Sequence, residues 1–185
     1  MKCRKDQRGF TLVEIAIVLV IIGLLLGAIL KGQEMIKSAK IKRVVKQTDE
    51  LRAASYTYQD LYKYLPGDDP AATTRWSAAA GNGNANGQIA GGETYLLFNH
   101  LQVAGLISGS YNGTSDYPTH AFGGNIWLVW MTAQGKTSHW FNLENLPGEI
   151  AQIIDTTYDD GIFNNGAIRG SAAYTNAAVT LYVEF

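Results

Sequence analysis

The chain opens with a long, almost unbroken apolar run. From Phe10 to Leu30 every residue is apolar or glycine except Thr11 and Glu14. A helix rises about 1.5 Å per residue, so a run of this length reaches about 30 Å, the thickness of the hydrocarbon core of a bilayer. The pattern therefore predicts a membrane-length helix close to the N-terminus.

A second, amphipathic pattern continues the same helix. Side chains suited to a buried face recur at steps of three and four residues, as on one side of an α-helix. No proline occurs between Met1 and Pro66, and the sequence LPGDDP at 65–70 then ends the helix. We expect one helix from about Phe10 to Tyr64, on the order of 80 Å long. The expected buried positions are Ile41, Val44, Thr48, Leu51, Ser55, Tyr58, Tyr62 and Leu65.

The remainder of the chain predicts a globular head of mixed structure. Alternating apolar and polar residues indicate strands, and glycine and proline mark the ends of short helices. The fold class expected is α+β, with an antiparallel sheet laid on the amphipathic part of the long helix. The expected elements are a helix at 93–104 ended by Gly105, hairpin strands at 124–132 and 137–143, a helix starting near Pro147, and a last strand at 177–185.

These patterns divide the chain into four segments. We expect a leader at 1–9, a hydrophobic transmembrane or filament-core helix at 10–34, its amphipathic continuation at 35–64, and the globular head at 65–185. The head is long enough to bury a core without disulfides. The only cysteine is Cys3, so loss of the leader would leave no cysteine and exclude an intramolecular disulfide or a cysteine-based metal site.

Charge is distributed unevenly between the long helix and the head. From Phe10 to Tyr64 there are eight Lys and Arg against five Asp and Glu, a net charge of +3. From Leu65 to Phe185 there are three against ten, a net charge of −7. A head this acidic cannot neutralise phosphates, so no nucleic-acid partner is expected.

Glu14 is costly in its apolar surroundings. A carboxylate costs up to about 2.5–3.5 kcal/mol in a membrane helix, and less near its end. A plain anchor has no use for such a group, whereas a helix that docks onto another copy can offset the cost with a cation. We expect Glu14 to have no partner in its own chain and to pair with the amine that cleavage before Phe10 would create on a neighbouring copy.

The sequence RGFTLVE at 8–14, after a short basic leader, resembles the class III signal of type IV pilins and of the pseudopilins of type II secretion. The resemblance implies a pilin-like fold, cleavage after Gly9 by a prepilin peptidase, N-methylation of Phe10, and pairing of Glu14 with the N-terminus of an adjacent subunit. Many pilins have proline where this chain has Lys31, so a straight helix is expected here.

The same resemblance implies function and location. It implies a structural subunit that polymerises with itself through its hydrophobic stem, with help from an inner-membrane assembly platform. The protein would lie in the bacterial inner membrane with its head in the periplasm, and then in an extracellular pilus or a periplasmic pseudopilus. The stem is common to pilins and pseudopilins, so both readings stay open. A membrane-anchored binding module that does not polymerise is the alternative from another class.

A loop in the head matches a calcium-binding template. The sequence NGNANGQIAGGE at 82–93 fits the EF-hand pattern, with asparagine in place of the first aspartate. A solvated Asn/Gly turn is the alternative interpretation. The expected calcium ligands are the side chains of Asn82, Asn84, Asn86 and Glu93 and the backbone carbonyl of Gln88, with Asp68 and Asp69 folding over to add charge.

The sequence shows no catalytic motif. His100, His120 and His139 are far apart and form no metal-binding pair, and motifs for a serine nucleophile or a phosphate-binding loop are absent. We therefore expect no enzymatic activity. The Asp-rich loop at 155–170 is a second candidate for a metal, with a less ordered spacing than 82–93.

Overall fold

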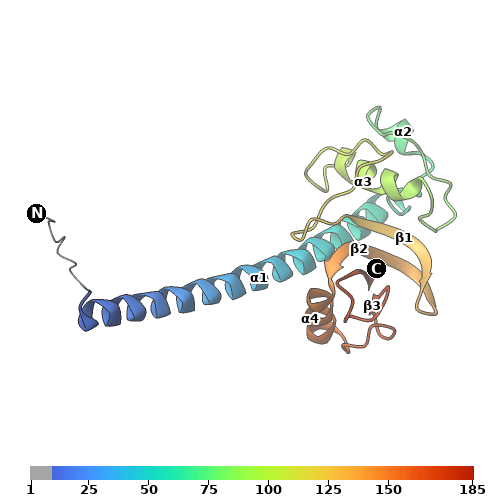
Figure 1. The fold of residues 1–185 in the computed structure, drawn as a ribbon. Coiled ribbons are helices and arrows are strands. Elements are labelled where there is room, and N and C mark those ends of the chain that lie inside the picture. Colours follow the sequence, from blue (N-terminus) through green and yellow to red (C-terminus); the bar gives the residue numbers. More distant parts are fainter. Residues whose placement is uncertain (1–9) are drawn as a thin grey trace, which may run out of the picture. The chain divides into compact units, whose positions relative to one another are not determined.

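The computed structural model describes residues 10–185, so the predicted leader at 1–9, with Gly9, lies outside the described residues (Figure 1). The chain forms two compact units, one ending at Ala39 and the other running from Lys40 to Phe185. Helix α1, Leu12–Tyr62, contributes residues to both units. The prediction of one helix from about Phe10 to Tyr64 is confirmed, and the helix continues through Lys31.

The second half of α1 supplies one side of the core. Its buried residues follow the predicted stripe, with Ala54 added and Tyr62 only half-buried. The Thr48 hydroxyl donates to the Val44 carbonyl at 3.0 Å and the Ser55 hydroxyl to the Leu51 carbonyl at 2.8 Å. Because these hydroxyls are satisfied within the helix, the two polar residues of the stripe are buried without needing partners in the head.

The head is built on a four-stranded antiparallel sheet in the order β1-β2-β4-β3. Its strands are β1 Ile126–Ala133, β2 Lys136–Pro147, β3 Ile168–Gly170 and β4 Ala178–Glu184. The predicted hairpin is confirmed, with Gln134 and Gly135 at φ of +47° and +82° in a two-residue turn. Strand β2 runs further than expected, to Pro147, across an irregularity between Leu143 and Leu146.

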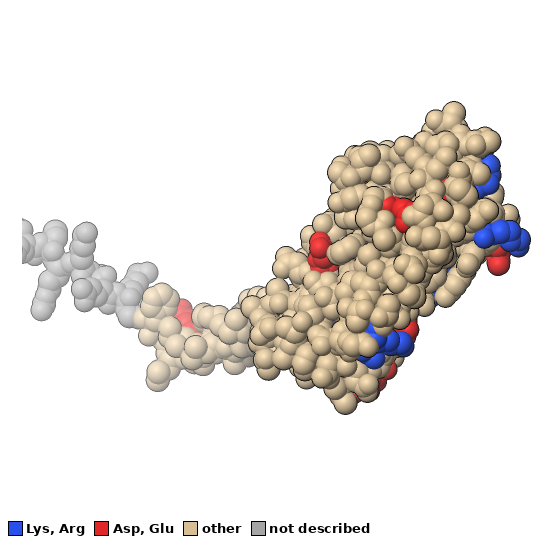
Figure 2. Space-filling model, turned by 90° about the vertical axis from the view of Figure 1, so that its right-hand side faces the viewer, with Lys and Arg blue, Asp and Glu red and all other residues tan. Residues whose placement is uncertain are grey.

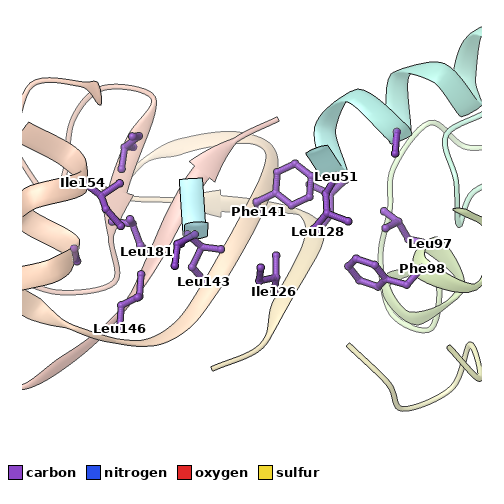
Figure 3. Packing of buried hydrophobic residues seen from close by; sticks show 14 of the residues in the cluster. Leu51, Leu97, Phe98, Ile126, Leu128, Phe141, Leu143, Leu146, Ile154 and Leu181 are labelled. Carbon is purple, nitrogen blue, oxygen red and sulfur yellow. The ribbon is translucent and has the colours of Figure 1, made fainter. Parts of the chain in front are cut away.

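Three helices complete the head: α2 Ala72–Arg75, α3 Glu93–Val103 and α4 Gly148–Tyr158. The predictions of α3, of α4 starting beside Pro147, and of the last strand are confirmed, which establishes the expected α+β, pilin-like fold class. The short elements α2 and β3 were not predicted. In the core, Leu51 of α1, Leu128 of β1 and Phe141 of β2 belong to one buried cluster, as Figure 3 shows.

Candidate assembly site and candidate cation loop

The first half of α1 is long and apolar enough to cross a membrane. An 18-residue window of the helix has a mean hydropathy of 3.0, and none of that window is buried. Side chains such as Leu12 and Leu24 are 91% and 72% exposed. So much apolar surface is unstable in water, so this segment requires lipid or other protein around it.

Glu14 lies at the first turn of α1, where it forms a reciprocal cap with Thr11. The Glu14 carboxylate accepts the Thr11 backbone N–H and the Thr11 hydroxyl, both at 2.8 Å, and the Thr11 hydroxyl oxygen accepts the Glu14 N–H at 3.2 Å. This is a capping box, which satisfies two of the free N–H groups at a helix start.

The expectation that Glu14 has no partner in its own chain is therefore wrong. The T-x-x-E spacing at 11–14 is itself the signature of a capping box, so the sequence carries a signal for this partner. The carboxylate is nevertheless exposed, and each oxygen of a carboxylate accepts more than one hydrogen bond. A cap from Thr11 and a cation from another copy are thus compatible. Phe10, the first described residue, is 83% exposed.

The asparagines of the loop at 82–93 accept hydrogen bonds from nearby backbone N–H groups. The Asn82 side-chain oxygen accepts from the Thr73 N–H at 2.9 Å. The Asn84 side-chain oxygen accepts from the Asn86 N–H at 3.0 Å, and that of Asn86 from the Gln88 N–H at 2.7 Å. Three of the expected ligand oxygens therefore hold the loop in shape.

Two buried carboxylates converge on this loop from its two sides. Asp68 accepts the N–H groups of Asn86 and Gly87 at 3.0 and 2.7 Å, and Glu93 accepts those of Asn84 and Ala90, both at 3.1 Å. Asp68 and Glu93 are only 2% and 7% exposed. The loop therefore gathers two negative charges, which its backbone N–H groups stabilise.

Asp69 points elsewhere. Its carboxylate accepts the Tyr58 hydroxyl at 2.7 Å and the Ala71 N–H at 2.9 Å, and it forms an ion pair with Arg75. Burial raises the pKa of the Tyr58 hydroxyl to about 12, so that group is a donor throughout the physiological range. Asp69 thus ties the end of α1 to the segment that contains α2.

We propose that the loop at 82–93 binds one calcium ion, with Asp68 and Glu93 as its anionic ligands. Because the N–H bonds to these carboxylates compete with a cation, we expect affinity at the weak end of the known range, about 10⁻⁴–10⁻³ M. At ten times the dissociation constant, binding adds about 1.4 kcal/mol. Millimolar calcium should give a modest, saturable rise in the melting temperature of the chain made without residues 1–35, and magnesium a smaller one.

Glu93→Gln is the matched test because it keeps the shape of the side chain and removes one charge. It should abolish the calcium response. If calcium leaves the melting temperature unchanged, or if the response survives in Glu93→Gln, the loop is a plain Asn/Gly turn.

The second acidic loop brings Asp155, Asp159 and Asp160 together, with one carboxylate oxygen of each within 4.8 Å of the others. Asp155 accepts the Tyr174 hydroxyl at 2.6 Å, Asp159 the Ile168 N–H at 2.8 Å and Asp160 the Ile162 N–H at 2.8 Å. Burial raises the pKa of Asp155, and its acidic neighbours act in the same direction. These carboxylates close the loop that leads from α4 to β3.

The three histidines are buried parts of the fold. One ring nitrogen of each accepts a backbone N–H: His100 that of Gly67 at 3.0 Å, His120 that of Phe122 at 3.2 Å and His139 that of Ile89 at 3.1 Å. A ring that accepts must be neutral. Burial, the largest cause in each case, lowers the pKa of all three.

The head should therefore lose stability in mild acid. The folded pKa of each histidine lies below its unfolded value near 6.5, so the unfolded chain binds more protons and stability rises with pH. The free energy of unfolding in urea should fall from pH 7.5 to pH 5.5. Asp155, whose pKa is raised, acts in the opposite sense at the acid end. A free energy that is flat or rises as the pH falls over this interval would contradict the assignment of neutral rings.

Comparison with known proteins agrees with this geometry at the N-terminus. Residues 4–30 match the family model of the prokaryotic N-terminal methylation motif. No curated protein and no solved structure matches the chain. The matched residues include the capped Glu14 and most of the membrane-length segment.

The methylation motif stands at the start of a chain with a pilin-like fold. The chain carries a prepilin-type N-terminal signal, followed by one long helix and an antiparallel sheet. This signal, at residues 4–30, is the class III signal of type IV pilins and pseudopilins. The signal and the apolar helix fit anchoring in the inner membrane before assembly.

Proposed function

We propose that the protein is a structural subunit of a type IV pilus-like filament. The observation that carries this proposal is the match of residues 4–30 to the methylation motif, together with the exposure of every residue of α1 from Leu12 to Leu30. Prepilin peptidase cleaves after Gly9, Phe10 is N-methylated, and an inner-membrane assembly platform adds the subunit to the filament. Glu14 pairs with the methylated terminus of a neighbouring copy while Thr11 keeps its cap.

The head is suited to a structural role rather than to catalysis or to binding nucleic acid. Its histidines serve the fold, as described above. On the face shown in Figure 2, most of the surface is uncharged, and some of the positive and negative side chains adjoin one another. A pseudopilin of a type II secretion system shares the same signal and stem, and differs in forming a short periplasmic filament.

Intact-mass analysis of the protein from its native host tests the processing step. The mass should correspond to a chain that starts at Phe10 and carries one added methyl group. A chain that begins at Met1, or one cut after the apolar run, would contradict the proposal. Immunogold electron microscopy then separates long surface fibres from a periplasmic pseudopilus and from an anchored protein that does not polymerise.

A further inference from the structure

The unit from Lys40 to Phe185 exposes six large apolar side chains, which fall into two groups. The first group lies on the last turns of α1 and just after them. Tyr56 stacks on Phe185 and is partly covered, whereas Leu61 is 60% exposed. The second group belongs to α4 and the loop after it. The six are Tyr56, Leu61, Tyr64, Ile153, Tyr158 and Ile162.

A hollow of about 220 Å³ lies beside the second group. It is bounded by the 45–52 turns of α1, by α4 and by the sheet, and Tyr158 stands at its rim, 53% exposed. We refer to it as the α4 hollow. Its apolar lining comprises Val45, Leu143, Ile154, Ile168 and Val183.

The charged groups around the α4 hollow are already paired. Arg52 contacts Asp49 at 2.6 Å and donates to the Glu184 carbonyl at 2.8 Å, while the Glu184 carboxylate pairs with Lys136 at 2.6 Å. With these charges neutralised, the hollow favours an apolar side chain over a charged ligand.

Leu61 and the α4 hollow lie on opposite sides of α1. A helix turns about 100° per residue, so Leu61 is about 180° from Arg52 and about 160° from Val45. It is also about 18 Å further along the axis than Asp49. Because Leu61 and the α4 hollow face opposite ways, Leu61 cannot fill the hollow of its own chain. Shifted copies with parallel α1 axes bring the two together.

We propose that the α4 hollow receives Leu61 of a second copy of the chain, a contact between the heads of neighbouring copies that rests on the proposed filament function. The contact joins two different surfaces. A row of copies therefore has a free α4 hollow at one end and a free Leu61 at the other, which is the condition for an open polymer rather than a closed dimer.

Charge favours the same pairing. Lys63, beside Leu61, donates to the Asp60 backbone carbonyl at 2.7 Å and forms no ion pair within this unit. Asp159 and Asp160, which follow Tyr158, accept backbone and amide N–H groups, with no Lys or Arg partner in the unit. A contact that seats Leu61 beside Tyr158 brings Lys63 toward Asp159 and Asp160, with the exposed Asp60 next to Leu61 in the chain.

Cysteine cross-linking tests the contact in assembled filaments of the full chain. In a Cys3→Ser background, Leu61→Cys combined with Tyr158→Cys should give a ladder of three or more copies on a non-reducing gel. Each single variant should give no ladder, and Leu61→Cys with Thr137→Cys, on the exposed hairpin, is the matched control. Filaments without a ladder, or dimers from Leu61→Cys alone, would overturn the contact. A parent chain that forms no filaments would instead refute the proposed function.

If the cysteines themselves weaken assembly, a second experiment tests the same contact with a charge substitution. Leu61→Asp should lower filament yield at least tenfold with an unchanged melting temperature of the head, because Leu61 is exposed in the single chain. Thr175→Asp adds the same charge at an exposed loop position and should assemble normally. Normal filaments from Leu61→Asp would exclude the α4 hollow as its binding site.

Discussion

Replacing Glu14 by alanine should abolish filament assembly while leaving the protein inserted in the membrane. The variant removes the carboxylate that, in our proposal, neutralises the terminal amine of a neighbouring copy. An unpaired charge in lipid costs about 2.5–3.5 kcal/mol, so each docking event should weaken roughly a hundredfold. Membrane fractionation together with electron microscopy of sheared cell surfaces measures both outcomes in one preparation.

The capping box makes a matched control necessary, because Glu14→Ala also removes a cap at the start of α1. Thr11→Ala removes the hydroxyl contacts to Glu14 and keeps the carboxylate, at a cost of about 0.5–2 kcal/mol to the helix end. It should assemble far better than Glu14→Ala. Equal losses in the two variants would mean that Glu14 acts only as a cap, and normal filaments from Glu14→Ala would refute the pairing outright.

Phe141→Ala should destabilise the head by about 3–5 kcal/mol. The Phe141 ring is fully buried in the cluster that joins α1 to the sheet, pairs across the hairpin with Leu128, and lies 5.8 Å from the Phe185 ring (Figure 3). A loss of that size is a large part of the stability of an ordinary domain. Urea unfolding of the chain without residues 1–35, followed by tryptophan fluorescence, gives the difference.

The control for this substitution is Thr137→Ala on the same strand, where the side chain is exposed. Its cost should stay within about 0.5 kcal/mol. If Phe141→Ala cost less than about 1 kcal/mol, the second half of α1 would not depend on the sheet for its stability.

Most of the fold could be predicted because its long elements carry strong periodic signals. The stripe on α1 and the alternation in β4 each follow from burial on one face, which the sequence expresses directly. Strand β3 has only three residues and no such period. It is fixed by Arg169, whose guanidinium donates to the carbonyls of Ala133 and Gln134, a contact between distant parts of the chain.

For the candidate sites, the sequence predicted which residues lie in a loop but not which partners they bind. Spacing along the chain locates side chains but not the directions in which they point. Asp68 and Asp69 are adjacent, yet Asp68 binds the 82–93 loop and Asp69 binds Tyr58 and Arg75. The histidines carried no pattern, because partners from distant parts of the chain hold their rings. These partners are Gly67 and Gly81 for His100, Glu144 for His120 and Ile89 for His139.

The strand order has a consequence for how the head is made. Strand β4 lies between β2 and β3, and β3 pairs with β4 alone. During synthesis, β2 therefore waits with one open edge while the 30 residues between Pro147 and Ala178 are added. At about 5–20 residues per second this takes roughly 2–6 s. An open edge is a template for pairing with another chain. During this interval the unpaired edge of β2 is therefore the part of the nascent head that a chaperone would need to cover.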